Sequence, residues 1–223
     1  MVYRRTEKTV RRLAQRHGAI IAAAREAASE GGMAAVQVAP VAARAGIAAG
    51  TVYRYFPSKT DLVAALVAAV SEHEIGALRR VAEAAPGPLS ALAAAIATFA
   101  SRALAQRRLA WAVIGEPVDA QADAVRLVYR KALAAEFQTH IERAIRDGRL
   151  PAQDAHLSAA ATVGALLESL IGPLAPETAE GELEPVQALT LFVLRGLGIP
   201  DARARGLVAS GTTENAGEAA AQA

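Results

Sequence analysis

The chain contains no cysteine and few aromatic residues, and both shortages limit its chemistry. Without thiols it forms neither disulfide bonds nor thiolate metal sites, which fits a reducing compartment. Aromatic residues make up 4% of its 223 residues, whereas hydrophobic residues make up 53%. A core of this composition has to be built mainly from Ala, Leu, Val and Ile, in the manner of packed helices.

Targeting signals are also missing. Residues 1–16 are basic and polar, and no apolar stretch follows them as it would in a secretory signal. No uninterrupted apolar run reaches the roughly 18 residues that a membrane span needs. We therefore expect a soluble cytoplasmic protein that has no membrane partner.

Catalytic and metal-binding motifs are equally scarce. The four histidines are scattered; His73 could be joined by Glu72 or Glu74, but no further His, Cys or carboxylate recurs at the spacing of a metal site. Gly46 and Gly50 are too few for a phosphate-binding loop, since no Gly-Lys-Ser/Thr sequence follows them. These absences predict a protein that is not an enzyme and that holds no cofactor or metal.

The positive charge is concentrated near the N-terminus. Residues 1–60 contain ten Lys and Arg residues against three Asp and Glu residues, although the net charge of the whole chain is only +2. The remaining residues therefore hold 14 bases and 19 acids. Such an asymmetry indicates a basic module that binds a polyanion, attached to a body that does not. A solvated charged tail is the alternative explanation of the charge alone.

Apolar and small residues recur at intervals of three and four along most of the chain, which predicts helices. The first predicted helix covers Arg11–Glu30 and ends at the two glycines that follow. A short helix is expected near residues 39–45, because Pro40 is tolerated only in a first helical turn. Longer helices are expected at about 61–83, 119–146, 154–174 and 183–197, and residues 201–223 are expected to be disordered. The predicted fold class is all-α.

The stretch VAARAGIAAGTVYRYFPSKTDL contains the most informative motif. Its short alanine-rich helix ends at Gly46, where glycine can adopt a positive φ without steric cost. A second helix, roughly residues 49–56, places Val52 and Phe56 four residues apart, so that both can face the core. Two short helices joined by a glycine turn predict a helix-turn-helix, whose second helix enters the major groove of DNA. The alternative is an ordinary helical hairpin that has the two tyrosines of this stretch in its core.

The same stretch resembles the DNA-binding domain of the TetR family of transcriptional regulators. The resemblance rests on the run GIAAGTVYRYFPSKTDLV, on VAARA before it and on the helix IIAAAREAASEGG, and it covers about residues 17–64. It implies an N-terminal three-helix head with a helix-turn-helix, followed by a larger helical body for ligand binding and dimerisation. The implied domains are a basic extension at 1–16, the head at 17–64, the body at 65–200 and a tail at 201–223.

Carried over residue by residue, the resemblance implies which residues bind DNA. Base reading falls chiefly on Thr51, Tyr53 and Arg54, because arginine pairs with guanine and the threonine methyl can meet a thymine methyl. The full set of expected DNA-binding residues is Gln37, Arg44, Ala49, Gly50, Thr51, Tyr53, Arg54, Tyr55 and Lys59.

Two hydroxyl caps that are usual in the family are absent. Gln37 stands where a threonine usually caps the second helix, and Ala48 stands where a serine usually caps the recognition helix. A lost cap typically costs about 1 kcal/mol and also removes a hydroxyl that can bind an anion. Phosphate anchoring is therefore expected to depend more on Arg44, Lys59 and the basic residues between 4 and 16.

The functions of the body are implied by the architecture of the family rather than by a close match in sequence. The residues expected to line a pocket for an apolar or aromatic effector are Phe99, Leu104, Trp111, Tyr129, Leu133 and Phe137. The residues expected to pair the last two long helices with their copies across a twofold axis are Leu166, Leu167, Leu170, Ile171, Leu189 and Val193. Either set can instead be the core of a single chain.

Together these features predict a sequence-specific DNA-binding transcriptional regulator. The expected protein is a homodimeric repressor that a small-molecule effector releases from a palindromic operator in double-stranded DNA. Whether residues 4–16 follow the DNA or are solvated stays open at this point. The competing function is a helical ligand-binding or interaction module whose basic head binds another polyanion, such as RNA or an anionic membrane surface.

Overall fold

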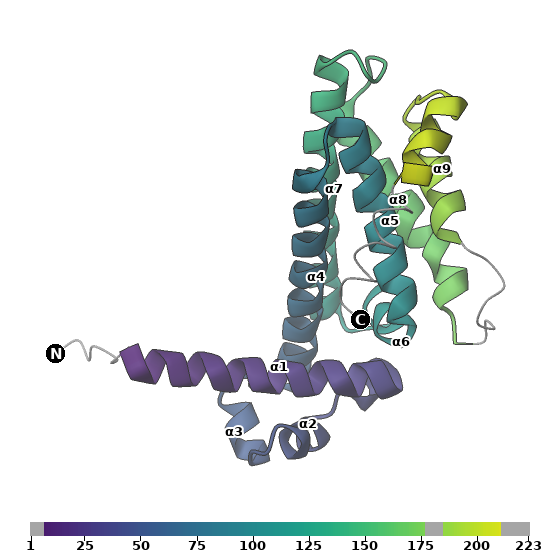
Figure 1. Ribbon diagram of the computed structural model, residues 1–223. Helices are drawn as coiled ribbons and strands as arrows, with labels where there is room; N and C mark the ends of the chain where they lie inside the picture. Colours follow the sequence, from purple (N-terminus) through teal and green to yellow (C-terminus); the bar gives the residue numbers. More distant parts are fainter. Residues whose placement is uncertain (1–6, 177–184, 211–223) are drawn as a thin grey trace. The chain divides into compact units, whose positions relative to one another are not determined.

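The computed structural model describes residues 7–176 and 185–210, and all regular secondary structure in these ranges is helical (Figure 1). The helices are α1 Glu7–Ala35, α2 Val38–Arg44, α3 Ala49–Tyr53, α4 Lys59–Ala84, α5 Pro88–Ala105, α6 Arg107–Ile114, α7 Ala120–Arg146, α8 Ala155–Leu174 and α9 Pro185–Gly196. Residues 201–210 are helical as well. The all-α fold class is confirmed.

The described residues form two compact units. The first takes the residues up to Val70 together with Arg108–Arg126, and the second takes Ser71–Arg107 and the residues from Leu127 onward. The first unit contains the predicted head at residues 17–64 and extends beyond it. The segment Arg108–Arg126, which the sequence assigned to the body, packs within the first unit.

Helix α1 is longer than the predicted Arg11–Glu30 at both ends. It begins at Glu7, so residues 7–16 of the predicted basic extension are the first turns of a helix, while residues 1–6 lie outside the described chain. The predicted stop appears as a kink, because Gly32 has φ 70° and ψ −166°. This region of backbone space is essentially restricted to glycine.

The core of the first unit is aliphatic, as the composition requires. It joins α1, α2, α3 and the start of α4 through fully buried side chains such as Ile20, Val41, Val52 and Leu62. Leu109 of α6 is buried in the same cluster. These contacts remove apolar surface from water, which is the main driving force for holding such short helices in place.

A polar clasp fastens the segment Arg108–Arg126 to the kink of α1. The backbone N–H of Met33 donates a hydrogen bond of 2.7 Å to Glu116 Oε2, and Glu116 Oε1 lies 2.6 Å from Arg108 Nη1. A Cβ atom at Gly32 would stand 2.2 Å from both Arg108 Nη2 and Glu116 Oε1. Glycine is thus favoured at position 32 for two reasons: its backbone angles, and the space that the side chains of Arg108 and Glu116 occupy.

The second unit packs α5, α8 and α9 against one another. Polar pairs tie its part of α4 to the neighbouring helices: Arg102 binds Glu74 between α5 and α4, and Tyr129 of α7 donates a hydrogen bond of 2.5 Å to Glu72 Oε1. Burial and this carboxylate together raise the pKa of Tyr129 to about 12.

Helices α5 and α8 are long and apolar enough, by length and composition, to cross a membrane. Each also contributes a run of buried residues to the second unit, including Leu92 and Ile96 of α5 and Leu166 and Leu170 of α8. Core helices of water-soluble proteins have the same composition, so packing within this unit accounts for their hydrophobicity.

The prediction of disorder from residue 201 is wrong for residues 201–210, which form a helix. Ala204 is fully buried, and Asp201 accepts hydrogen bonds from Arg195 Nε at 2.7 Å and from Arg205 Nε at 2.9 Å. The composition of the tail concealed this helix because one buried alanine and a local ion-pair network are enough to dock it. Residues 211–223 lie outside the described chain.

Candidate nucleic-acid interface

The turn between α2 and α3 has the geometry that a helix-turn-helix needs. Gly46 adopts φ 66°, and the N–H groups of Gly46 and Ile47 donate to the carbonyls of Ala43 and Ala42 at 3.1 and 3.0 Å. This double closure is a Schellman motif, which ends a helix and satisfies its last carbonyl groups. The predicted role of Gly46 is confirmed, and Ile47 packs partly buried against the core.

Helix α3 is anchored on one side and exposed on the other. Val52 is fully buried and Phe56 retains 4% exposure, as their spacing predicted. On the outer side Tyr53 keeps 51% of its surface exposed, and Arg54 is exposed beside it. The helix is shorter than predicted, because it ends at Tyr53 in a turn where Phe56 N–H donates to the Val52 carbonyl at 2.9 Å.

Both missing caps are confirmed. Gln37 and Ala48 occupy the N-cap positions of α2 and α3, and neither gives a side-chain hydrogen bond to its helix. The Gln37 amide instead donates to the Ala34 carbonyl at 2.9 Å. The first N–H groups of α3 that lack an intrahelical acceptor therefore stay open for other acceptors.

The start of α3 offers room for close approach. Gly50 is exposed, and a Cβ atom placed on it would meet nothing within 4 Å. Packing within the chain therefore does not require glycine here, although glycine in a helix costs roughly 0.5–1 kcal/mol relative to alanine. Ala48 and Thr51 beside it also have small side chains, and Ala48 is exposed while Thr51 is half-buried.

Tyr55 and Lys59 flank α3 in different environments. Tyr55 is half-buried, and its ring lies 6.4 Å from that of His17 in an edge-on arrangement. Lys59 is exposed at the first position of α4. Ser58 caps that helix by accepting a hydrogen bond of 3.1 Å from Asp61 N–H, while its hydroxyl donates to Asp61 Oδ2 at 2.7 Å. The Ser-x-x-Asp spacing was a signal for this cap that the sequence analysis did not use.

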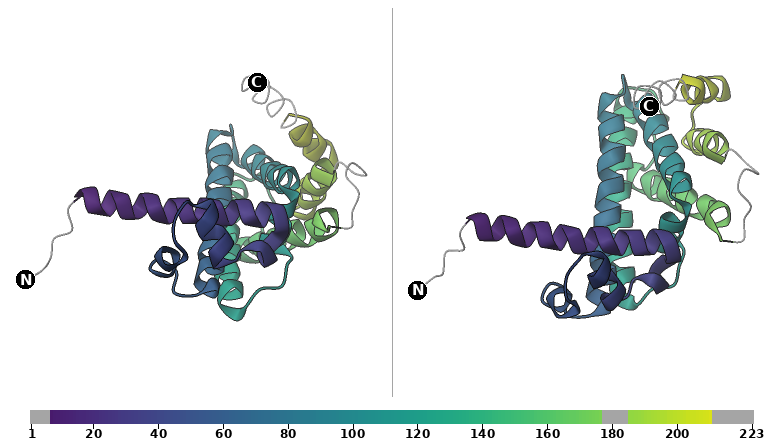
Figure 2. Two further views of the ribbon diagram at one scale, coloured as in Figure 1. Left: turned by 90° about the horizontal axis from the view of Figure 1, so that it is seen from below. Right: turned by 60° about the horizontal axis from the view of Figure 1, so that its bottom comes forward.

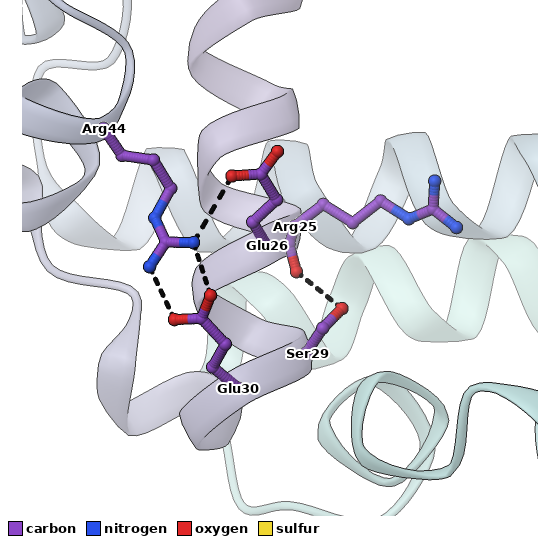
Figure 3. A network of polar contacts seen from close by, with 5 residues as sticks. All are labelled: Arg25, Glu26, Ser29, Glu30 and Arg44. Carbon is purple, nitrogen blue, oxygen red and sulfur yellow. Dashed lines mark hydrogen bonds and ion pairs between the residues drawn. The ribbon is translucent and has the colours of Figure 1, made fainter.

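Arg44 is bound by two carboxylates within the chain. Its guanidinium donates to both carboxylate oxygens of Glu30, at 2.6 and 2.5 Å, and to Glu26 at 3.3 Å (Figure 3). These hydrogen bonds raise the pKa of Arg44 further above its ordinary value and lower the pKa of Glu30. Two carboxylates neutralise the charge that a phosphate anchor needs. Arg44 therefore holds α2 against α1, a role that Glu26 and Glu30, one helical turn apart, could have signalled.

The residues predicted to line a pocket do not all lie in one unit. Trp111 belongs to the first unit, where a Cβ atom at Gly115 would stand 2.7 Å from its ring. The other five belong to the second unit. Leu133 and Phe137 are buried there with 5% and 1% exposure, and the Tyr129 hydroxyl is bound to Glu72.

The residues predicted to form a dimer interface are mostly occupied within the chain. Leu166 and Leu170 are fully buried, and Leu189 and Val193 retain 6% and 4% exposure. Only Leu167 and Ile171 keep intermediate exposure. The same two helices expose other apolar side chains, namely Leu157 at 66% and Phe192 at 63%. Helical periodicity identified the two helices, but most of the residues it selected lie on the faces that are buried within the chain.

Helix α2, the glycine turn and the exposed helix α3, all carried by a compact helical unit, place this part of the chain in the class of helix-turn-helix proteins. Residues 20–66 match the family model for bacterial regulatory proteins of the tetR family. The head of the chain is therefore similar to that of the TetR family, which is one of transcriptional regulators.

Curated relatives match the same part of the chain. The transcriptional repressor KstR of Rhodococcus jostii is 48% identical over 54 residues, which is 24% of this chain and 26% of that protein. KstR of Mycolicibacterium smegmatis is 51% identical over 49 residues, or 22% of this chain and 24% of that protein. The match thus spans about a quarter of the length of these relatives.

Solved structures share the fold over most of the chain. The protein RolR, crystallised with resorcinol, is 22% identical with a TM-score of 0.69, covering 89% of this chain and 95% of that one. The fatty acid degradation regulator FadR of Bacillus halodurans is 21% identical with a TM-score of 0.71, covering 83% and 97%. FadR of Bacillus subtilis, crystallised with stearoyl-CoA, is 23% identical with a TM-score of 0.69, covering 81% and 97%.

Proposed function

We propose that this protein is a sequence-specific DNA-binding transcriptional regulator, and specifically a homodimeric repressor that a small molecule releases from a palindromic operator. The observation that carries this proposal is the two-sided character of α3. Val52 and Phe56 fix the helix in the core, while Tyr53 and Arg54 are exposed on its outer side. Core aromatics in an ordinary hairpin, the alternative for this stretch, would not leave half of Tyr53 exposed.

The proposed division of labour follows from the chemistry of each side chain. Arg54 can donate two parallel hydrogen bonds to a guanine edge, and the Thr51 methyl can contact a thymine methyl. Tyr53 can contact a base edge beside them, and Tyr55 and Lys59 can donate to phosphate oxygens. Gly50 leaves space for the DNA to approach the backbone of α3 closely. Arg44 is removed from the proposed contact set, because its guanidinium is bound to two carboxylates.

We place the proposed dimer interface on the outer faces of α8 and α9. Leu157 and Phe192 carry it, together with Leu167 and Ile171, because these side chains retain surface that a partner can cover. Aromatic residues dominate the binding energy of most protein interfaces, which favours Phe192 as the central contact. A twofold dimer presents two copies of α3, so the proposed operator is palindromic.

The proposed effector is apolar or aromatic, and its proposed site lies in the second unit. Phe99, Leu104, Leu133 and Phe137 supply apolar walls there, and Tyr129 with Glu72 supplies a polar group. RolR and FadR, which share the fold, were crystallised with resorcinol, a small aromatic diol, and with stearoyl-CoA, which carries a long acyl chain. A cytoplasmic location follows from this function, since the operator is in the chromosome.

Selection of bound duplexes from a random pool tests the proposal directly. The expected result is an enriched palindrome, bound with an affinity that falls as salt concentration rises. R54A should then relax the preference at one base pair of each half-site and cost about 1–3 kcal/mol per contact. R130A, which removes an exposed arginine of α7, is the matched control and should change neither affinity nor sequence preference.

Two outcomes would overturn the proposal. A pool that yields no enriched sequence would show that α3 does not read bases. An R54A protein that binds all duplexes more weakly by the same factor, with unchanged preference, would favour the alternative of a head that binds polyanions in general.

A further inference from the structure

The N-terminal half of α1 extends beyond the rest of the first unit. Figure 1 and both views of Figure 2 show this helix crossing α2 and α3 and continuing past α3 at its N-terminal end. From Val10 to Ala19 every residue except Leu13 is exposed, whereas burial begins at Ile20. The His17 ring lies 5.0 Å from that of the core residue Phe56, so the segment before it, about two turns of helix, is the part held away from the core.

This projecting segment carries uncompensated positive charge. Arg11, Arg12 and Arg16 are exposed, and none of them forms an ion pair within the described part of the chain. Their situation differs from that of Arg44, which two carboxylates neutralise. A helix segment with few core contacts that keeps several like charges is costly to maintain, unless a partner of opposite charge accounts for it.

Two of these arginines share a side of α1 with α2. Arg12 lies about five helical turns before Glu30, and Arg16 lies about four turns before it, so both return to the side of the helix that bears Glu30. Glu30 is the residue that binds Arg44 of α2. The two guanidinium groups therefore extend the face of the unit on which the helix-turn-helix is mounted.

Arg11 occupies a different side of the same turn. It lies about two and a half turns from the core residue Ile20, which puts it on the side of α1 opposite the core. Arg11 and Arg12 thus carry the same charge at nearly the same position along the helix axis but point in directions about 100° apart. The chain supplies its own control for any effect that depends on position rather than on total charge.

We propose that Arg12 and Arg16 form a second DNA-binding surface, which contacts the phosphate backbone of the duplex outside the base pairs that α3 reads. The inference rests on the proposed function, because it assumes that α3 lies in a major groove. The partner is duplex DNA of any sequence, since guanidinium groups on a straight helix meet regularly spaced phosphate oxygens and read no base. This surface supplies the phosphate anchoring that the missing caps of α2 and α3 and the neutralised Arg44 do not supply.

Counterion release gives the size of the expected effect. Each phosphate neutralised on duplex DNA adds about 0.9 to the slope of log affinity against log salt concentration. R12Q/R16Q should therefore lower that slope by about 1.8 per protomer, and by about 3.6 for a dimer on a full operator. The reduction of the slope should be equal on the selected operator and on an unrelated duplex, because these arginines contact only phosphates.

The test measures these slopes for the full chain with its selected operator, by fluorescence anisotropy over a series of salt concentrations. The proteins are the unchanged chain, R12Q, R11Q and R12Q/R16Q. Each duplex is prepared in a short form that ends at the palindrome and in a long form extended by flanking base pairs. Circular dichroism checks that all variants keep their helix content, since exposed glutamines do not disturb the core.

If the contact depends on position, R12Q should lower the slope of log affinity against log salt concentration more than R11Q does. R12Q/R16Q should lower that slope on the long duplex and leave the sequence preference unchanged. The proposal is overturned if R11Q and R12Q have the same effect, or if R12Q/R16Q leaves the slope unchanged while R54A still relaxes base preference. Failure of the underlying function has a different signature, because then the unchanged chain selects no operator at all.

Discussion

Gly32 offers the sharpest test of how the first unit is held together. Its φ of 70° with ψ of −166° lies in a region that costs a residue with a side chain on the order of 1–3 kcal/mol. The Cβ atom of G32A would also stand 2.2 Å from Glu116 Oε1 and Arg108 Nη2. Both atoms end flexible side chains, so they can move aside, but the Glu116 carboxylate then leaves the Met33 N–H.

The expected loss adds the backbone cost to the cost of that hydrogen bond. A hydrogen bond to a charged group contributes about 1.5–3 kcal/mol, and Glu116 is exposed by only 15%. The Arg108 pair adds little, because the guanidinium is 36% exposed and solvent screens it. We therefore expect G32A to lower the free energy of unfolding of the first unit by about 3–5 kcal/mol.

Urea unfolding followed by tryptophan fluorescence measures this loss. Trp111 is the single tryptophan of the chain and belongs to the first unit, so its emission reports on the unfolding of that unit. G18A is the matched control in the same helix. A Cβ atom at Gly18 meets nothing within 4 Å, so this variant should be more stable by about 0.5–1 kcal/mol.

A double-mutant cycle separates the clasp from the backbone strain. E116A should cost about 2 kcal/mol in the unchanged chain and clearly less in G32A, where the carboxylate is already displaced. Equal costs in the two backgrounds, or a loss in G32A of less than about 1 kcal/mol, would refute the reasoning.

Two further predictions concern the second unit. The raised pKa of Tyr129 means that folding favours its neutral phenol, so its contribution to stability is present below about pH 10 and is lost as the pH rises toward 12. Ultraviolet titration should show one late phenolate step that Y129F removes, and a step unchanged in Y129F would contradict the assignment. F192E should convert the dimer to a monomer in sedimentation experiments, because Phe192 is 63% exposed in the single chain. L127E alters a leucine of α7 with 52% exposure and should leave the dimer intact, so dissociation of both variants would count against the α8–α9 interface.

The sequence by itself determined the all-α fold and the helix-turn-helix. Helical periodicity located the helices, because burial of one face leaves a repeat of three and four residues in any amphipathic helix. Gly46 was recognisable because no other residue closes that turn as cheaply, and Val52 and Phe56 because their spacing matches one helical turn. These features depend only on neighbours in the chain, which is why local reasoning was sufficient.

Tertiary structure decided every feature that depends on a distant partner. Arg44 was predicted as a phosphate anchor from its place in the motif, and only the tertiary structure showed that Glu26 and Glu30 of another helix bind it. The segment Arg108–Arg126 joined the first unit through a clasp whose halves are 83 residues apart in sequence at Met33 and Glu116. The inner and outer faces of α8 and α9 are similarly apolar in sequence, so only packing against α5 showed which face is buried. Periodicity shows that a helix has an apolar side. Which element packs against that side, and which charges pair, is determined by residues far away in the sequence.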